Sequence, residues 1–235
     1  MAFFQEVRPA REPIFRAPAA VLGLIGLLIV AHVARMLAPP ALSLRILNEF
    51  ALDPAAYVSP AATWIDWLVP PFSHMLLHGS LMHLTINCLW LLAFGPVVAR
   101  RFGSASFLVF FVLCGIAGAA CFVAMEWGMN VGAIGASGAI SGLMAAAIRM
   151  IRFRDPYLNI ATLPLMPVFS AQVLLFSAVW LALNFLTGLF GGVVMGTIEP
   201  IAWQDHLGGY LAGLLLAGPF EYYVGFAARL RRVGA

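Results

Sequence analysis

The chain has 235 residues, of which 63% are hydrophobic and 10% are charged, and its formal net charge is +3. Soluble domains carry about 25% charged residues, so this composition excludes a water-soluble enzyme, a nucleic-acid-binding protein and a disordered chain. The 13 basic residues are all arginines, and they are spread too thinly to form a phosphate-binding face. The sequence therefore predicts an integral membrane protein that crosses the bilayer several times.

Six apolar stretches are close in length to the ~20 residues that cross a bilayer as a helix. They cover residues 18–37, 76–98, 104–125, 135–151, 168–193 and 203–224. We therefore predict an all-α membrane protein in which six transmembrane helices form one domain at residues 18–226. Short basic tails are expected at residues 1–17 and 227–235.

The long connection between the first two spans, residues 38–75, is rich in aromatic side chains. Trp64, Trp67 and Phe72 belong to the residue types that accumulate where lipid headgroups meet water. We therefore predict that this connection is a long interfacial loop that lies at the membrane surface instead of in open water.

The arginines predict the orientation of the spans, because cytoplasmic loops of membrane proteins carry an excess of Arg and Lys. With the N-terminus placed inside, Arg35 and Arg45 are the only arginines that fall on the outer side. Both termini are therefore expected in the cytoplasm. The arginine-only, alanine-rich composition also indicates a bacterial inner membrane.

With this orientation, spans two, four and six all run from outside to inside, and each carries polar residues in its opening turns. These are His78, His83 and Asn87 in the second span, Ser137 in the fourth and His206 in the sixth. Polar side chains are costly in hydrocarbon and usually face a bundle interior or a wet cavity. Their common depth on three helices predicts one shared site.

Ser137 stands at the start of the fourth span, in the segment Gly135-Ala136-Ser137-Gly138. The apolar run 135–151 is about 25 Å long as a helix, which is shorter than the ~30 Å hydrocarbon core, so the helix should begin below the membrane surface. The unpaired N–H groups of its first turn would then favour an oxyanion beside a serine nucleophile. The alternative is that Ser137 is only a small residue at a close helix crossing.

His206 is the candidate base, because imidazole is the usual group that activates a hydroxyl near neutral pH. It would act on Ser137 as a serine–histidine dyad. The preceding Asp205 cannot complete a triad, since neighbouring helical residues do not face each other, so we expect packing to orient the imidazole. The alternative for His206 is a structural hydrogen bond to a neighbouring helix. Of the other histidines, His32 is expected to be structural and His74 to be a loop residue.

Four glycines favour a close approach of the fourth and sixth spans. Gly209 and Gly213 share one face of the sixth span with the histidine and form a G-x-x-x-G pattern, and Gly138 and Gly142 form a second one after the serine. Such patterns let helix backbones touch. We therefore expect these helices to pack face to face and to bring the hydroxyl and the imidazole within hydrogen-bond reach.

His83 and Asn87 are four residues apart and stack on one face of the second span. Both side chains can donate hydrogen bonds, so they are candidates to complete an oxyanion hole with the Ser137 amide. His78 is expected nearer the surface, where it can order water or a loop. A metal-binding histidine pair is disfavoured, because this span has no His-Glu-x-x-His segment and no nearby acid.

Taken together, the pattern resembles that of the rhomboid intramembrane serine proteases. The resemblance covers residues 18–226 and is carried by the motifs His78-x4-His83-x3-Asn87, Gly135-Ala136-Ser137-Gly138 and His206-x2-Gly209-x3-Gly213. It implies a six-helix bundle that holds a water-filled cavity open to the outer side. It also implies Ser137 as nucleophile, His206 as general base and acid, and His83, Asn87 and the Ser137 amide as oxyanion donors.

For the reaction, the resemblance implies cleavage of single-span membrane proteins in or near their transmembrane segment. The expected partners are these substrates and the lipid bilayer, and no cofactor, metal, nucleotide or nucleic acid is expected. A substrate helix would enter past the fifth span, where Phe185 and Phe190 are gate candidates. The alternatives are a catalytically inactive rhomboid-like protein that binds membrane clients, and a small transporter, which the lack of an internal repeat disfavours.

The chain departs from the family pattern at three places. Val69-Pro70 stands where the family often has a Trp-Arg pair, Ser141 replaces the usual Tyr or Phe four residues after the nucleophile, and Asp205 replaces a small residue before the histidine. The first departure bears on the conformation of the loop, and the other two bear on the orientation and basicity of the histidine.

Overall fold

The computed structural model describes residues 17–152, 163–195 and 201–233, and within these ranges the regular structure is helical apart from one isolated bridge between Leu52 and Ala133. The prediction of an all-helical protein is thereby confirmed for the described residues. Most of the predicted tail at 1–17, and residues 234–235 of the tail at 227–235, lie outside them.

Each of the six predicted spans overlaps one long helix. The long helices are α1 (Ala19–Leu37), α5 (Leu81–Phe102), α6 (Ser104–Met125), α7 (Ser137–Met150), α8 (Ala171–Met195) and α9 (Trp203–Val233). Among the described helices, α1, α5, α6 and the Ala171–Phe190 part of α8 are long and apolar enough to cross a membrane, and α7 is apolar but has 14 residues. The described residues therefore belong to an integral membrane protein with four apolar helices of membrane length and a fifth, shorter apolar helix.

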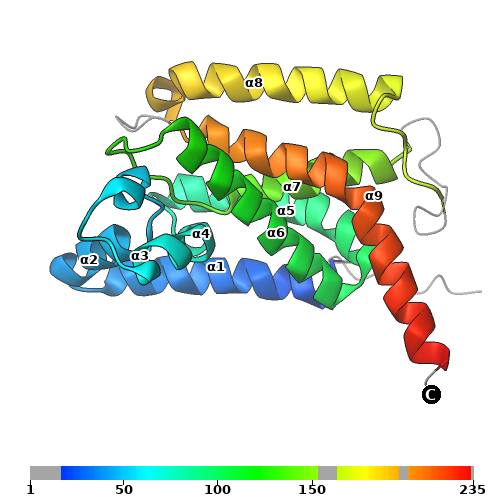
Figure 1. Cartoon of the computed structure of the whole chain (residues 1–235), viewed down its shortest axis with the longest axis horizontal. Coiled ribbons are helices and arrows are strands. Elements are labelled where there is room, and N and C mark those ends of the chain that lie inside the picture. Colours follow the sequence, from blue (N-terminus) through cyan, green and yellow to red (C-terminus); the bar gives the residue numbers. More distant parts are fainter. Residues whose placement is uncertain (1–16, 153–162, 196–200, 234–235) are drawn as a thin grey trace, which may run out of the picture.

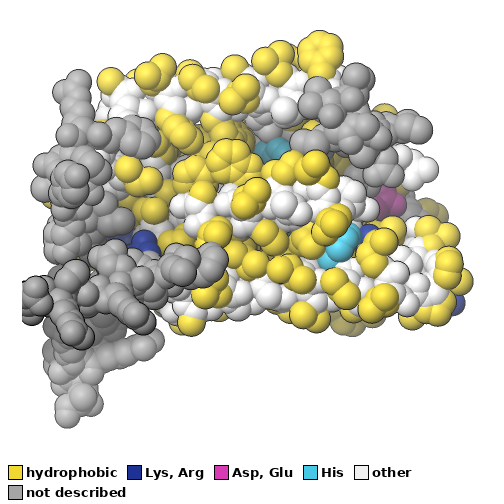
Figure 2. Space-filling model, turned by 180° about the vertical axis from the view of Figure 1, so that it is seen from behind, with side chains coloured by type: hydrophobic (Ala, Val, Ile, Leu, Met, Phe, Trp, Pro, Cys, Tyr) yellow, Lys and Arg dark blue, Asp and Glu magenta, His cyan; other side chains and the backbone are white. Residues whose placement is uncertain are grey.

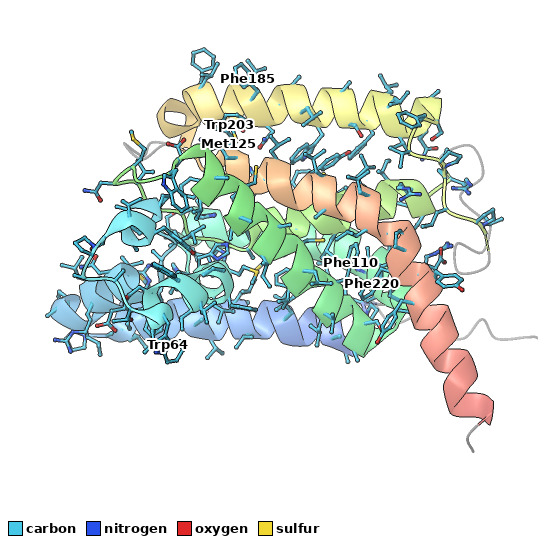
Figure 3. All side chains as sticks on the ribbon, in the orientation of Figure 1. Trp64, Phe110, Met125, Phe185, Trp203 and Phe220 are labelled. Carbon is cyan, nitrogen blue, oxygen red and sulfur yellow. The ribbon has the colours of Figure 1, made fainter. Side chains whose placement is uncertain are left out.

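The connection at residues 38–75 is folded into short helices. It contains α2 (Pro40–Phe50), the 3₁₀ helix η1 (Pro54–Val58), α3 (Trp64–Leu68), α4 (Pro70–Ser73) and the 3₁₀ turn η2 (His74–Leu76). These elements gather at one end of the bundle beside α1 (Figure 1). The side chains of Trp64, Trp67 and Phe72 are exposed, which suits a segment at the membrane surface, and Trp64 lies at the outer edge of this end in Figure 3.

Helix α3 begins with a capping box. The Thr63 backbone N–H donates to Asp66 Oδ2 at 2.7 Å, and the Thr63 hydroxyl donates to the same oxygen at 2.8 Å. Both bonds favour the charged carboxylate, so they lower the pKa of Asp66. The cap helps to start a helix that is too short to form by propensity alone.

Helix α5 begins at Leu81, and the predicted start of the second span at residue 76 is wrong. The Ser80 side chain accepts a hydrogen bond from the His83 backbone N–H at 3.2 Å, and this bond caps the helix. The residues before Ser80 belong to η2 and to an extended link. His83 therefore lies in the first turn of α5, whereas His78 precedes the helix.

Helix α7 lies in the middle of the bundle. Every residue from Gly138 to Met150 is buried, and α5, α6 and α9 pack around it. Because protein surrounds α7, its length need not match the ~30 Å hydrocarbon core. Helix α8, by contrast, lies along one edge of the bundle (Figure 1), and only 11% of its apolar stretch is buried.

Several arginines lie at the end of the bundle opposite the short helices. Arg101 Nε donates to Glu221 Oε1 at 2.7 Å, and Arg149 Nη1 donates to the Leu214 carbonyl oxygen at 2.7 Å. Arg152 Nη1 donates to the carbonyl oxygen of Arg149 at 3.3 Å. These three arginines are among those that the charge pattern assigns to the cytoplasmic side. That this end of the bundle faces the cytoplasm stays a prediction.

Helices α7 and α9 touch backbone to backbone at four glycines. A Cβ atom on Gly209 would overlap the carbonyl group of Gly138, and one on Gly213 would overlap the carbonyl group of Gly142. A Cβ atom on Gly142 would in turn lie 2.7 Å from the Gly209 carbonyl oxygen. These obstacles are backbone atoms that cannot turn aside, so a larger residue at these positions would push the helices apart.

Replacing Gly213 by Val is therefore expected to destabilise the protein by about 1–3 kcal/mol, because the new side chain overpacks a backbone contact. The matched control is Gly23→Val in α1, where a Cβ atom meets nothing within 4 Å. Thermal unfolding in detergent measures both variants. A Gly213→Val midpoint equal to that of Gly23→Val would contradict the close packing of α7 on α9.

Candidate active site

Ser137 and His206 are 69 residues apart in the chain and meet between α7 and α9. His206 Nε2 lies 2.7 Å from Ser137 Oγ, which is a hydrogen-bond distance. Ser137 is the first residue of α7, and His206 is in the first turn of α9. Both residues are half-buried. The structure thus brings together the two residues that the sequence singles out as candidate nucleophile and base.

The turn before Ser137 requires glycine. Gly135 has a φ of 124°, a conformation that side chains rarely adopt, and its N–H donates to the His74 carbonyl oxygen at 2.8 Å. A Cβ atom at Gly135 would also lie 2.7 Å from His83 Nε2. The turn leaves Ser137 at the start of α7, where the first N–H groups have no partner within the helix.

His83 and Asn87 reach the same cavity as Ser137 and His206 from α5. The His83 ring lies against Gly135, two residues before the serine. Asn87 Nδ2 donates to the carbonyl oxygen of His83 at 3.0 Å within the helix. An amide carries two hydrogens, so this bond leaves one that can serve another acceptor.

The cavity between α5, α7, α8 and α9 has a volume of about 990 Å³, which is large enough for a sizeable ligand. The wall of the cavity is mostly apolar, and its apolar residues include Trp90, Phe94, Met144, Phe176 and Trp180. Figure 2 shows histidine atoms recessed beneath α8, which forms the top row, among hydrophobic side chains. Ser141, one turn after the candidate nucleophile, is buried and also lines this cavity.

Asn184 on α8 contacts the second ring nitrogen of His206. Asn184 Oδ1 lies 2.8 Å from His206 Nδ1, and Asn184 Nδ2 donates to the Trp203 carbonyl oxygen at 3.0 Å. The expectation that packing alone orients the imidazole is therefore wrong, because a buried amide bonds to it. The sequence signal was present, since Asn184 is an amide within an apolar span, where polar groups usually have a partner.

His74 lies in the turn η2, within the connection between the first two spans. Its side chain is buried, its Nδ1 lies 2.8 Å from the Pro70 carbonyl oxygen, and its Nε2 lies 3.7 Å from Asp205 Oδ1. Asp205 is buried as well and packs against Gly118 on α6 and Gly138 on α7. The carboxylate that precedes the candidate base thus faces away from it, toward η2.

His78 precedes α5 and lies behind the His83 ring. It is fully buried, and its ring meets that of His83 edge to face with the centroids 5.0 Å apart. Its carbonyl oxygen accepts from Arg35 Nη2 at 2.8 Å and lies 3.1 Å from His32 Nδ1, a structural contact of the kind expected for His32. In the described part of the chain, no group of three or more His, Cys, Asp or Glu side chains is arranged to hold a metal.

Comparison with known proteins places these motifs in a family. A model of the rhomboid domain matches residues 67–222. The chain is 27% identical over 163 residues to rhomboid-like protease 3 of Toxoplasma gondii, which covers 69% of this chain and 54% of that protein. It is 30% identical over 168 residues to the rhomboid protease GlpG of Klebsiella pneumoniae, and this match covers 67% of the chain and 54% of that protein. It is also 30% identical over 143 residues to GlpG of Haemophilus influenzae, and that match covers 61% of the chain and 65% of the relative.

The match to the family model extends over more than half of the chain and includes α5 to α8 and most of α9. The chain spans about half the length of the first two relatives. All the residues that the sequence singles out in the second, fourth and sixth spans fall within the matched region. The protein therefore belongs to the rhomboid family.

Proposed function

We propose that this protein is an intramembrane serine endopeptidase in which Ser137 is the nucleophile and His206 is the general base and acid. The observation that carries the proposal is the 2.7 Å contact between Ser137 Oγ and His206 Nε2 in a cavity among apolar helices. A serine hydroxyl is a weak nucleophile until a base accepts its proton, and this contact provides that base. Membership of a family whose named relatives are rhomboid proteases supports the same chemistry.

In the proposed reaction, Ser137 Oγ attacks a peptide carbonyl carbon while its proton passes to His206 Nε2. The resulting imidazolium then gives that proton to the leaving amine, and the C–N bond breaks to leave an ester on the serine. A water molecule then attacks the ester carbonyl carbon while His206 takes its proton. His206 returns this proton to Ser137 Oγ as the bond between Oγ and the carbonyl carbon breaks, which releases the carboxylic acid product and restores the serine. The chain's own residues can carry every step, so the proposal needs no cofactor.

The negative charge on the carbonyl oxygen requires hydrogen-bond donors at the start of α7. We assign this role to the Ser137 N–H, His83 and Asn87. The N–H groups of the first helical turn lack intrahelical partners, and the positive end of the helix dipole adds to them. His83 lies against Gly135, and Asn87 lines the same cavity. Donors that are held in place before the reaction stabilise the oxyanion most.

The membrane arrangement that we propose has six spans, α1 and α5 to α9, within one domain at residues 18–226 and with both termini in the cytoplasm of a bacterial cell. The arginines at the end opposite the short helices support this orientation. The cavity would then open toward the outer side. Helix α7 would start below the outer surface, where the other helices hold it.

Single-span membrane proteins are the substrates that this arrangement favours. The cavity wall is mostly apolar and is closed on one side by α8, which has few buried residues. A substrate helix would approach past α8, where Phe185 and Phe190 are both exposed. The Phe185 ring meets that of Trp203 edge to face, and both residues are labelled in Figure 3. Helical peptide bonds are shielded by their own hydrogen bonds, so Gly or Pro in the substrate should ease cleavage.

A fluorophosphonate probe is expected to label the protein covalently, and Ser137→Ala should abolish the labelling because the probe reacts with an activated serine. Gel fluorescence after incubation of the purified protein in detergent measures this. Equal labelling of both forms would contradict the nucleophile assignment. Absence of labelling in the folded parent would favour a catalytically inactive rhomboid that binds membrane clients.

His206→Ala is expected to lower the rate of cleavage of a single-span reporter by about 10²–10⁴-fold, which is the usual contribution of a general base. The matched control is Tyr210→Phe, one turn further along α9, which removes the hydrogen bond between Tyr210 and Ser177 but leaves the site intact. Cleavage is followed by electrophoresis and thermal unfolding checks the fold. A His206→Ala protein that cuts as fast as Tyr210→Phe would show that another group is the base.

A further inference from the structure

We propose that Asn184 is a positioning residue that fixes the tautomer of His206, so that the machinery is a Ser137–His206–Asn184 triad instead of a dyad. The proposal rests on the proposed function, since a tautomer matters only where the imidazole acts as a base. Its observations are separate, however. They are the two hydrogen bonds of the Asn184 side chain and its place on α8.

The orientation of the Asn184 amide follows from its partners. Its Nδ2 lies 3.0 Å from the carbonyl oxygen of Trp203, and a carbonyl can only accept a hydrogen bond. The NH₂ group must therefore point at Trp203. The oxygen Oδ1 is then the atom that lies 2.8 Å from His206 Nδ1. The hydrogen-bond network thus leaves one assignment of the amide atoms that satisfies both contacts.

This orientation decides which nitrogen of His206 carries the hydrogen. The Asn184 oxygen can only accept, so Nδ1 must be the N–H of the neutral ring, and Nε2 then has the lone pair. Nε2 is the atom that lies 2.7 Å from the Ser137 hydroxyl oxygen. The opposite tautomer would set two lone pairs against each other at Nδ1 and leave Nε2 unable to take the serine proton. Asn184 therefore holds the base in the form that the reaction requires.

Both ring nitrogens of His206 are occupied in this arrangement, so no third side chain is needed to orient the ring. Asp205, the adjacent acid, packs against Gly118 and Gly138 and lies 3.7 Å from the His74 ring. Because Asn184 is neutral, it acts by orienting the ring and not by balancing the charge of the imidazolium. This distinguishes it from the carboxylate of a Ser–His–Asp triad.

The position of α8 sets the position of Asn184. Helix α8 is joined to α9 by the contact of Ser177 Oγ with Tyr210 Oη at 2.8 Å and by the stacking of Trp180 on Tyr210, with ring centroids 4.1 Å apart. Asn184 lies two turns along α8 from Ser177 and is held at the first turn of α9 by its own bond to the Trp203 carbonyl oxygen. Loss of the Ser177 hydrogen bond alone leaves that bond and the Trp180–Tyr210 stacking in place. The geometry therefore links the edge helix of the bundle to the state of the candidate base.

The test compares the parent protein with Asn184→Ala, Asn184→Leu and Asn184→Asp. Asn184→Ala and Asn184→Leu lack the acceptor oxygen, and Asn184→Leu keeps the approximate size of the side chain. Asn184→Asp keeps an oxygen that can accept a hydrogen bond from His206 Nδ1–H. The matched control is Ser177→Ala, which removes one hydrogen bond between α8 and α9 away from His206. Thermal unfolding identifies the variants that fold, and the comparison uses whichever of Asn184→Ala and Asn184→Leu is folded.

The decisive readout is the ¹⁵N spectrum of protein labelled in its histidines, with His206 signals identified by their loss in His206→Ala. The parent, Ser177→Ala and Asn184→Asp are expected to carry the hydrogen on Nδ1, whereas Asn184→Ala or Asn184→Leu should lose this preference. The rate of fluorophosphonate labelling should fall about 10- to 100-fold in the variants without the acceptor, which is the loss expected for one hydrogen bond to a ring that becomes charged when it takes the serine proton. It should stay close to the parent rate in Ser177→Ala.

A parent ring with its hydrogen on Nε2 would overturn the proposal, and so would an unchanged tautomer in the folded Asn184→Ala or Asn184→Leu protein. A slower labelling rate without a change of tautomer would also overturn it, because Asn184 would then act by packing. Since the spectrum is independent of activity, a parent protein that fails to react with the probe would refute the proposed function and still leave the Asn184 assignment tested.

Discussion

The backbone contact between α7 and α9 is the constraint on which the rest of the site depends. The hydroxyl of Ser137 and the imidazole of His206 can reach each other only if the helices approach closely at Gly138, Gly142, Gly209 and Gly213. A small displacement of one helix would break a hydrogen bond of 2.7 Å. Packing of small residues thus determines the chemistry that the pair can perform.

The surroundings of this contact explain how polar groups are tolerated among apolar helices. The Asn184 amide has partners for both its donor and its acceptor, and the His206 ring bonds through both nitrogens. Gly135 is held by the His74 carbonyl, and His78 supports the ring of His83 from behind. Burying such groups is costly without hydrogen bonds, so these pairings offset the cost and also fix the geometry.

The sequence predicted the long helices well because each is a continuous apolar run with charged or helix-breaking residues at its ends. It also predicted the approach of Ser137 and His206, since glycine spacing and polar residues at one depth are local signals. It missed the role of Asn184, whose partners Trp203 and His206 lie on another helix. It also missed the short helices at 38–75 and the start of α5 at Leu81. These depend on local features such as the prolines that begin α2 and α4 and the caps of α3 and α5, and not on apolar length.

The central claim, that Ser137 is activated by His206, is tested most directly by an experimental structure of the protein after reaction with a fluorophosphonate in lipid. The account predicts phosphorus bonded to Ser137 Oγ, its oxygen directed at the start of α7, and His206 within hydrogen-bond distance of the adduct. Phosphorus on another residue, or a His206 ring turned toward the acyl chains and too distant to share a hydrogen bond with Ser137, would contradict it.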